Sequence, residues 1–145
     1  MSSAVVHCSE GRFARQFEEL LARVGSPDAE HVSLPGGPWW FAEGSRLTRN
    51  RLARMAAQRA LPARTTFRGL VAASGIRRLI LLGHQECAWY ARLHTGMEPA
   101  DQIRRQAEDI LRARDGAAAL FGPGVVISGH VLTFDDSGAR FRTLF

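Results

Sequence analysis

The sequence predicts a single three-layer α/β domain over residues 1–145, with a mainly parallel central sheet and an antiparallel edge hairpin. Three observations support this fold class. Short apolar runs of strand length alternate with segments of helical periodicity, as in folds that join parallel strands through helices. Residues 79–82 are apolar throughout, which is typical of a strand buried on both faces. Residues 135–138, Asp-Asp-Ser-Gly, separate two strand-like segments and favour a hairpin turn.

The order of the elements follows from apolar spacing and from turn residues. Apolar side chains recur at helical spacing between Phe13 and Val24, and Gly25 follows as a stop. Pro99 favours the first position of a later helix. The predicted strands are residues 5–8, 31–34, 79–82, 125–134 and 139–144, and the predicted helices are residues 11–24, 45–60, 65–74, 88–94 and 99–114.

Length and composition indicate an ordinary globular protein. A chain of 145 residues, 46% of them hydrophobic, can bury the core of one domain. No apolar run is long enough to span a bilayer, and the N-terminus lacks the pattern of a signal peptide, so we expect a cytoplasmic protein without a membrane partner. The net charge of +5 comes from arginines scattered between Arg12 and Arg142, which does not favour a nucleic-acid partner.

A candidate metal site follows the apolar strand of residues 79–82. Gly83 ends that strand, and His84 and Cys87 come next at a spacing of three, so both side chains can reach one ion. Two ligands do not make a stable zinc site. The other cysteine, Cys8, ends the first predicted strand, and parallel strands that end side by side would bring it to the same sheet edge. A Cys2His set leaves one zinc position open for water, as in catalytic sites.

Two further residues extend this pattern into a resemblance. Cys8-Ser-Glu-Gly-Arg12 places a carboxylate two positions and a guanidinium four positions after the cysteine. Together with the later Gly83-His-Gln-Glu-Cys87, this order resembles the β-class carbonic anhydrases. Residues 129–138 are similar to the closing hairpin of that family, and Leu34-Pro-Gly-Gly37 stands where the family has its second strand and a Pro-Gly pair.

The resemblance implies a short, divergent member of the family. Glu10 stands where the family has aspartate, and Ala88 follows Cys87 where the family has glycine. The Arg-Asn-Ala-Gly-Gly segment that the family carries after its second strand has no counterpart, since Arg49-Asn50 lies in a helix-like stretch. These departures concern the surroundings of the metal site more than its three ligands.

The resemblance also implies a function. Zn²⁺ would be held by Cys8, His84 and Cys87, and zinc-bound hydroxide would hydrate CO2 reversibly to bicarbonate. The Glu10 carboxylate would accept a hydrogen bond from that hydroxide, and Arg12 would hold the carboxylate ionised and oriented. A homodimer or higher homo-oligomer is implied as well. Two alternatives stay open: a zinc hydrolase acting on another small electrophile, or a non-catalytic protein in which Glu10 closes the metal site.

Other residues of metal-binding or aromatic type are predicted to be structural. His7 precedes Cys8 in a strand and should point to the opposite face of the sheet. Residues 39–41 are predicted to form core or dimer contacts, and Trp89 and Tyr90 to shield the metal from solvent. Three histidines stand alone in the sequence and are predicted to be surface or core residues, with a proton shuttle as the alternative: His31, His94 and His130.

Overall fold

A computed structural model describes residues 2–42 and 75–145 of the chain. The helices predicted at residues 45–60 and 65–74 lie outside these described residues. The elements run in the order β1 (Ser3–Cys8), the 3₁₀ helix η1 (Gly11–Phe13), α1 (Ala14–Arg23), β2 (Glu30–Leu34), the 3₁₀ helix η2 (Gly37–Phe41), β3 (Arg78–His84), α3 (Ala88–Leu93), α4 (Pro99–Phe121), β4 (Val126–Asp135) and β5 (Gly138–Thr143).

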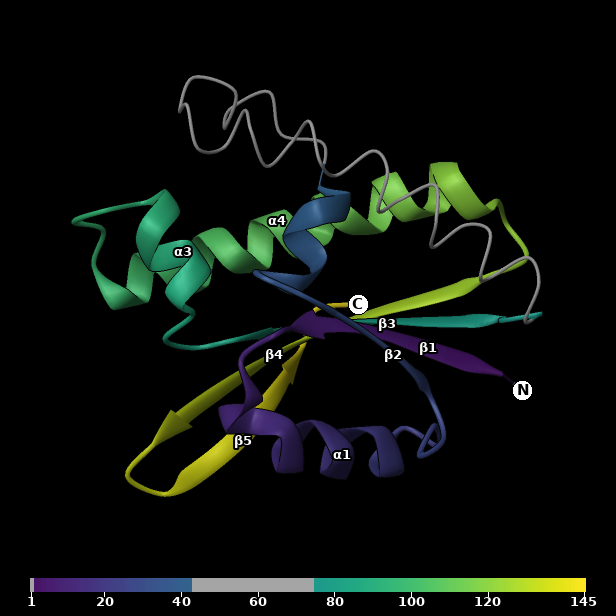
Figure 1. The fold of residues 1–145 in the computed structure, drawn as a ribbon, viewed down its shortest axis with the longest axis horizontal. Coiled ribbons are helices and arrows are strands. Elements are labelled where there is room, and N and C mark those ends of the chain that lie inside the picture. Colours follow the sequence, from purple (N-terminus) through teal and green to yellow (C-terminus); the bar gives the residue numbers. More distant parts are fainter. Residues whose placement is uncertain (1, 43–74) are drawn as a thin grey trace.

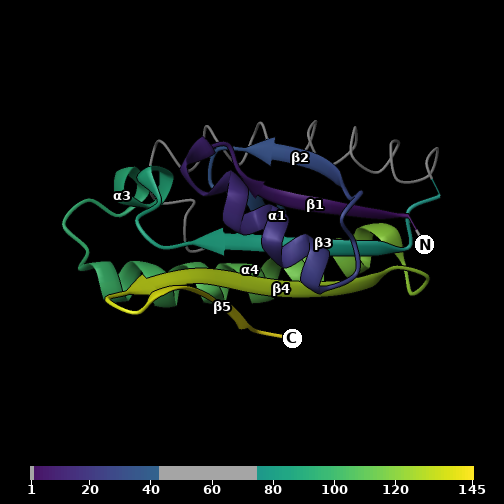
Figure 2. The same cartoon turned by 90° about the horizontal axis from the view of Figure 1, so that it is seen from below.

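The strands form one five-stranded sheet in the order β2-β1-β3-β4-β5. β1 pairs in parallel with β2 and β3, and β3 pairs in parallel with β4. β4 and β5 pair antiparallel, and their register ends with Asp135 opposite Gly138, as a tight hairpin requires. Figure 2 shows the arrows of β2 and β3 pointing toward the end of the sheet where α3 begins. The predicted fold class, mainly parallel with an antiparallel edge hairpin, is therefore confirmed.

Helices cover both faces of this sheet (Figure 1). α1 lies against one face, and η2, α3 and α4 lie against the other. Successive side chains of each strand point to opposite faces of the sheet. Val5, Ile80 and Leu82 belong to the core cluster that includes the apolar side chains of α1. The second core cluster joins the other strand positions to η2, α3 and α4, and it includes Ala4, Val6, Leu79, Leu81, Trp39, Trp40, Phe41, Tyr90 and Ile110.

Helix α4 is longer than the sequence predicts. Its Pro99 start is confirmed, but the helix continues beyond Arg114 for seven more residues to Phe121. Alanines at 117–119 favour the helical conformation and carry it past Gly116. The helix ends at Gly122, whose φ of 76° is one that glycine adopts without strain. No helix among residues 2–42 and 75–145 is long and apolar enough to cross a membrane.

Two histidines form a pair on the α1 face of the sheet. The ring of His7 packs against Phe17 of α1, on the face opposite the core cluster that contains Cys8. His31 is exposed, as its prediction as a surface residue requires, and its Nδ1 lies 3.0 Å from Nε2 of His7. The register of β1 and β2 explains the pair: Val5 lies opposite His31, and His7 is the next residue of β1 on the same face.

His130 is a buried structural histidine. It is 5% exposed, and its two ring nitrogens lie 3.1 Å from Thr143 Oγ1 and 3.3 Å from Ser128 Oγ. Burial lowers the pKa of His130 below the usual histidine value, because the charged form loses its hydration. These partners agree with the core prediction.

This burial gives a pH-dependent contribution to stability. The unfolded chain binds a proton at His130 more readily than the folded one, so the free energy of unfolding should fall as the pH drops below about 6.5. The variant His130→Gln should show a shallower fall between about pH 7 and 5. Urea denaturation of both proteins across this range measures the difference, and equal slopes would contradict the prediction.

Candidate metal centre

The three predicted ligands meet at the carboxyl edge of the sheet. Cys8 is the last residue of β1, His84 is the last residue of β3, and Cys87 directly precedes α3. Since β1 and β3 are neighbouring parallel strands, their ends lie at the same edge. All three side chains are buried, and their ligand atoms lie within 4.8 Å of one another. This buried Cys2His cluster can bind a metal ion.

The turn between His84 and Cys87 explains how one short segment presents two ligands. The Gln85 amide donates to the Leu132 carbonyl at 2.8 Å, and the Gln85 side chain accepts from the Phe134 amide at 3.0 Å, so residue 85 still belongs to the sheet edge. Glu86 then takes a left-handed conformation, with φ of 57°. This turn leads the chain into Cys87, the N-cap residue of α3.

The two sulfur atoms have the spacing of zinc ligands. Sγ of Cys8 and Sγ of Cys87 lie 3.8 Å apart. Two thiolates bound to one tetrahedral zinc ion at about 2.3 Å have their sulfurs about 3.8 Å apart, whereas a disulfide would need about 2.05 Å. The Gly36 amide donates to Cys8 Sγ at 3.4 Å, as main-chain groups do around metal-binding thiolates.

The contact between the two sulfur atoms shifts the pKa values of the two thiols in opposite directions. A hydrogen bond from Cys87 lowers the pKa of Cys8 to about 3, because it stabilises the Cys8 thiolate. The same contact raises the pKa of Cys87, because losing this proton would leave two anions side by side. The thiolate form, which metals bind, is therefore favoured at Cys8.

His84 offers a free lone pair to the cluster. Its Nδ1 donates to the Gln85 carbonyl at 2.8 Å, which orients the ring and leaves Nε2 toward the cluster. Nε2 is fully buried and has no hydrogen-bond partner. The Glu10 carboxylate lies 3.3 Å from it, in a geometry that makes no hydrogen bond. A buried acceptor without a partner, beside two sulfurs at zinc spacing, fits a Cys2His zinc site.

Glu10 and Arg12 border the cluster on its solvent side. Arg12 Nη2 donates to Glu10 Oε2 at 3.3 Å and to the Glu86 carbonyl at 2.9 Å. The Ala88 amide donates to Glu10 Oε1 at 3.4 Å. The Glu10 side chain is 22% exposed and that of Arg12 54%. The sequence-predicted pair is thus formed, and it contacts both segments that carry metal ligands.

Aromatic side chains pack against His84 on one face of the sheet and against Gly36, next to Cys8 Sγ, on the other. On the α1 face, the Phe13 ring lies 4.9 Å from the His84 ring and stacks on Phe134 at 5.4 Å. On the other face, Trp89 lies so close to Gly36 that a Cβ at position 36 would collide with the indole. Trp89 therefore covers the segment that donates to Cys8, and its role in shielding a metal from solvent stays a prediction.

The remaining predicted aromatic residues belong to the core. Residues 39–41 are buried in η2, which confirms their prediction as core residues. Tyr90 is buried behind Cys87, and its hydroxyl donates to Asp109 of α4 at 3.0 Å. Asp109 is itself buried and is paired with Arg112. This contact anchors α3 to α4 and fixes the start of α3, where Cys87 lies.

Gln106 is a functional residue that the sequence did not reveal. Its side chain accepts from the His84 amide at 2.7 Å and donates to the His84 carbonyl at 2.9 Å. Gly83 makes this approach possible, because a Cβ there would collide with Gln106 Oε1. The only sequence signal was Gly83 itself, since Gln106 is a polar residue among the apolar positions of α4. Gln106 thus holds the main chain of His84, one of the three candidate metal ligands.

We expect Gln106→Leu to destabilise the protein and weaken the metal site. The substitution leaves the buried amide and carbonyl of His84 without partners, at a cost of about 1–3 kcal/mol for each group. The free energy of unfolding should therefore fall by about 2–6 kcal/mol in urea denaturation. Gln102→Leu is the matched control, because Gln102 lies on the same helix and donates to the Met97 carbonyl. An equal loss in both variants would contradict the assigned role.

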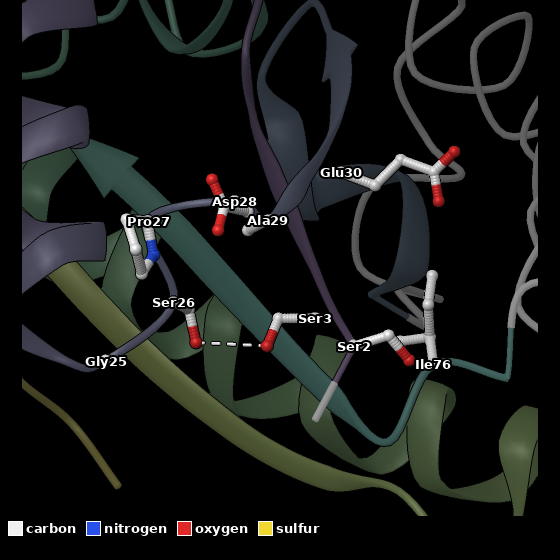
Figure 3. Close-up of a pocket in the computed structure, with 9 residues that line it drawn as sticks. All are labelled: Ser2, Ser3, Gly25, Ser26, Pro27, Asp28, Ala29, Glu30 and Ile76. Carbon is white, nitrogen blue, oxygen red and sulfur yellow. Dashed lines mark hydrogen bonds between the residues drawn. The ribbon is translucent and has the colours of Figure 1, made fainter.

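A hollow lies at the opposite edge of the sheet (Figure 3). It has a volume of about 540 Å³ and lies near the first residues of β1. Figure 3 shows Ser3 and Ser26 joined by a hydrogen bond, 3.0 Å long, in its lining. Its charged side chains are the exposed carboxylates of Asp28 and Glu30. The hollow is separated from Cys8 by the length of β1 and takes no part in the metal centre.

All five residues that the sequence singled out therefore lie at one sheet edge. Cys8, His84 and Cys87 form the buried cluster, and Glu10 and Arg12 flank it. Comparisons of the chain with protein-family models, with curated proteins and with solved structures give no match.

Proposed function

We propose that this protein is a zinc-dependent lyase of the carbonic anhydrase type, which interconverts CO2 and bicarbonate. One juxtaposition carries the proposal: the buried Cys2His cluster has the Glu10 carboxylate 3.3 Å from His84 Nε2. Three ligands of these types leave one zinc position for water, and a carboxylate beside that position is the group needed to orient it. The chain order of these residues is also the order that resembles the β-class enzymes.

The protein's own groups prepare the site for zinc. Zn²⁺ held by Cys8, His84 and Cys87 would supply a Lewis acid and, by lowering the pKa of a coordinated water to about 7, hydroxide at neutral pH. The hydrogen bond from His84 Nδ1 to the Gln85 carbonyl fixes the ring so that Nε2 faces the sulfurs. The Gly36 amide stabilises the Cys8 thiolate. The ligands are thus oriented and in part deprotonated in advance.

Glu10 would orient the reacting water. In the proposed mechanism its carboxylate accepts a hydrogen bond from that water, so that an oxygen lone pair faces the carbon of CO2. Arg12 and the Ala88 amide hold one carboxylate oxygen each, at 3.3 Å and 3.4 Å. The glutamate side chain, one methylene longer than aspartate, therefore has a fixed position rather than a free range of rotamers.

The surroundings suit a small neutral substrate and an anionic product. The Phe13 ring lies against His84, and Trp89 covers Gly36, whose amide donates to Cys8 Sγ; these apolar groups would limit the access of bulk water. CO2 carries no charge and does not need the hydration that these rings exclude. Arg12 is more than half exposed at the solvent side, where its charge favours bicarbonate.

Stopped-flow measurement of CO2 hydration by the zinc-loaded protein tests this function. We expect a rate above that of buffer that rises with pH around the pKa of about 7 of such a water. The Cys87→Ser protein, treated with zinc in the same way, gives the background. A wild-type rate equal to this background would reject the enzymatic proposal.

A second function is favoured by one distance. Two donors bound to a tetrahedral zinc ion at about 2.0 Å lie about 3.3 Å apart, which is also the separation of Glu10 Oε2 from His84 Nε2. Glu10 would then be a fourth ligand, and the zinc would stabilise the fold without catalysis. The hydrogen bonds from Arg12 and Ala88 leave a lone pair free on each Glu10 oxygen, so they are compatible with both functions, and the zinc affinity of Glu10→Gln separates the two.

A further inference from the structure

Glu86 has an unusual main-chain conformation. Its φ of 57° makes it the one non-glycine residue with a positive φ among residues 2–42 and 75–145. This left-handed conformation is sterically unfavourable for residues with a Cβ, and Asn, Asp or Gly are the residues usually found in it. A glutamate persists there only if its surroundings hold it.

The position of Glu86 gives this conformation a consequence for the metal centre. Glu86 lies between His84 and Cys87, two residues after the end of β3. The left-handed turn directs the chain into α3 while Cys87 Sγ stays near His84 Nε2. If Glu86 moved to a right-handed or extended conformation, the two ligands would no longer face the same point.

Arg12 holds this conformation from outside the turn. Its Nη2 donates to the Glu86 carbonyl at 2.9 Å, and its Nη1 lies 3.7 Å from the Glu86 carboxylate. The same guanidinium donates to Glu10, and Glu10 accepts from the Ala88 amide on the far side of Cys87. The segment that follows Cys8 is thereby joined to the main chain on both sides of Cys87.

We propose that Arg12 is a positioning residue for the metal ligands: it holds Glu86 in the left-handed turn that sets His84 and Cys87 toward one ion. Orienting the Glu10 carboxylate is a separate task of the same guanidinium. The inference rests on the metal centre of the proposed function, and it does not depend on CO2 as the substrate. It predicts that metal affinity, and not only turnover, depends on Arg12.

Cobalt binding to the full chain tests this role. Co²⁺ titration, followed by the thiolate-to-cobalt charge-transfer and d–d bands, measures the affinity and the geometry of the site. Arg12→Ala should weaken Co²⁺ binding about 10- to 100-fold, as the loss of outer hydrogen-bond partners of metal ligands does. Adding Glu86→Gly to Arg12→Ala should recover most of this loss, because glycine takes a positive φ without steric cost.

Matched variants separate the turn from simple charge effects. Adding Glu86→Ala to Arg12→Ala removes the same carboxylate but keeps the Cβ, so it should not recover affinity. Arg15→Ala removes an exposed arginine whose partner is Glu19 on α1, and it should bind Co²⁺ as the wild type does. Arg12→Lys keeps the charge but lacks the planar fork that reaches two acceptors, so it should weaken binding as well.

The outcomes distinguish this inference from the enzymatic proposal. Wild-type affinity in Arg12→Ala, or equal affinities in the glycine and alanine double variants, would overturn the role of Arg12. If the wild type binds Co²⁺ and the glycine variant recovers affinity, the role stands even where CO2 hydration is absent. Circular dichroism of each variant, with its thermal midpoint, confirms that the compared proteins are folded.

Discussion

Cys87→Ser is expected to lose stoichiometric zinc, whereas the wild-type protein should hold about one zinc ion per chain. The serine hydroxyl stays protonated at neutral pH and is not a zinc ligand of the kind found in Cys2His sites. Two donors then remain, too few to keep the ion during purification. Metal analysis of both purified proteins measures the difference, and equal zinc in both would end the ligand assignment.

The loss of zinc binding in Cys87→Ser should also lower the thermal stability of the protein. Zinc at about a thousand times its dissociation constant adds about 4 kcal/mol to the free energy of unfolding. For a chain of this size that corresponds to about 10 °C in Tm, which chelation of the wild type should remove. Cys87→Ser should show no such response to zinc or chelator. His31→Ala is the control, because His31 pairs with His7 outside the cluster and should leave the zinc content unchanged.

Glu10→Gln is expected to keep zinc and to lower kcat/KM for CO2 hydration by about 10²-fold or more, the scale of a positioned acid or base group. The amide has nearly the shape of the carboxylate, but it is neutral, so it accepts a weaker hydrogen bond from the reacting water and no longer attracts Arg12. Stopped-flow assays at matched zinc content measure the effect. Glu10→Asp keeps the charge on a shorter side chain and should lose less.

This variant also separates the two functions proposed for Glu10. If the carboxylate orients water, Glu10→Gln keeps its affinity for zinc and loses turnover. If the carboxylate is the fourth ligand, the variant loses affinity, because a neutral amide is a poor substitute for an anionic oxygen donor. Competition with a chromogenic chelator gives the affinity, and loss of zinc with unchanged turnover would contradict the mechanism proposed above.

The clustering of Cys8, His84 and Cys87 was predictable because it follows a simple rule of parallel sheets. Cys8 and His84 each end an apolar run, and the ends of neighbouring parallel strands lie at one edge. Applying this rule requires only the residues at which the strands end and the knowledge of which strands are adjacent in the sheet. The hairpin and the start of α4 were predictable for a similar reason, since turn residues and proline act locally.

The residues that hold the ligands were not predictable from local patterns. Gln106 reaches His84 across the space between α4 and β3, and nothing at helical spacing distinguishes it from a surface glutamine. The left-handed turn at Glu86 could not be predicted, because glycine or asparagine usually occupies this conformation and neither is present. A hydrogen bond from Arg12 to the Glu86 carbonyl holds the conformation instead. The pairing of His31 with His7 likewise required the register of β1 and β2. Each case depends on contacts between distant segments.

The separation of the donors along the chain has a consequence for biosynthesis. Cys8 and Cys87 are 79 positions apart, so a nascent polypeptide leaving the ribosome exposes the first thiol long before the second is made. All three side chains can coordinate one metal ion only after β1 has paired with β3. Metal binding would then be a late step of folding, because it requires the ends of a long loop to be brought together. Closing this loop in the unfolded chain is entropically costly.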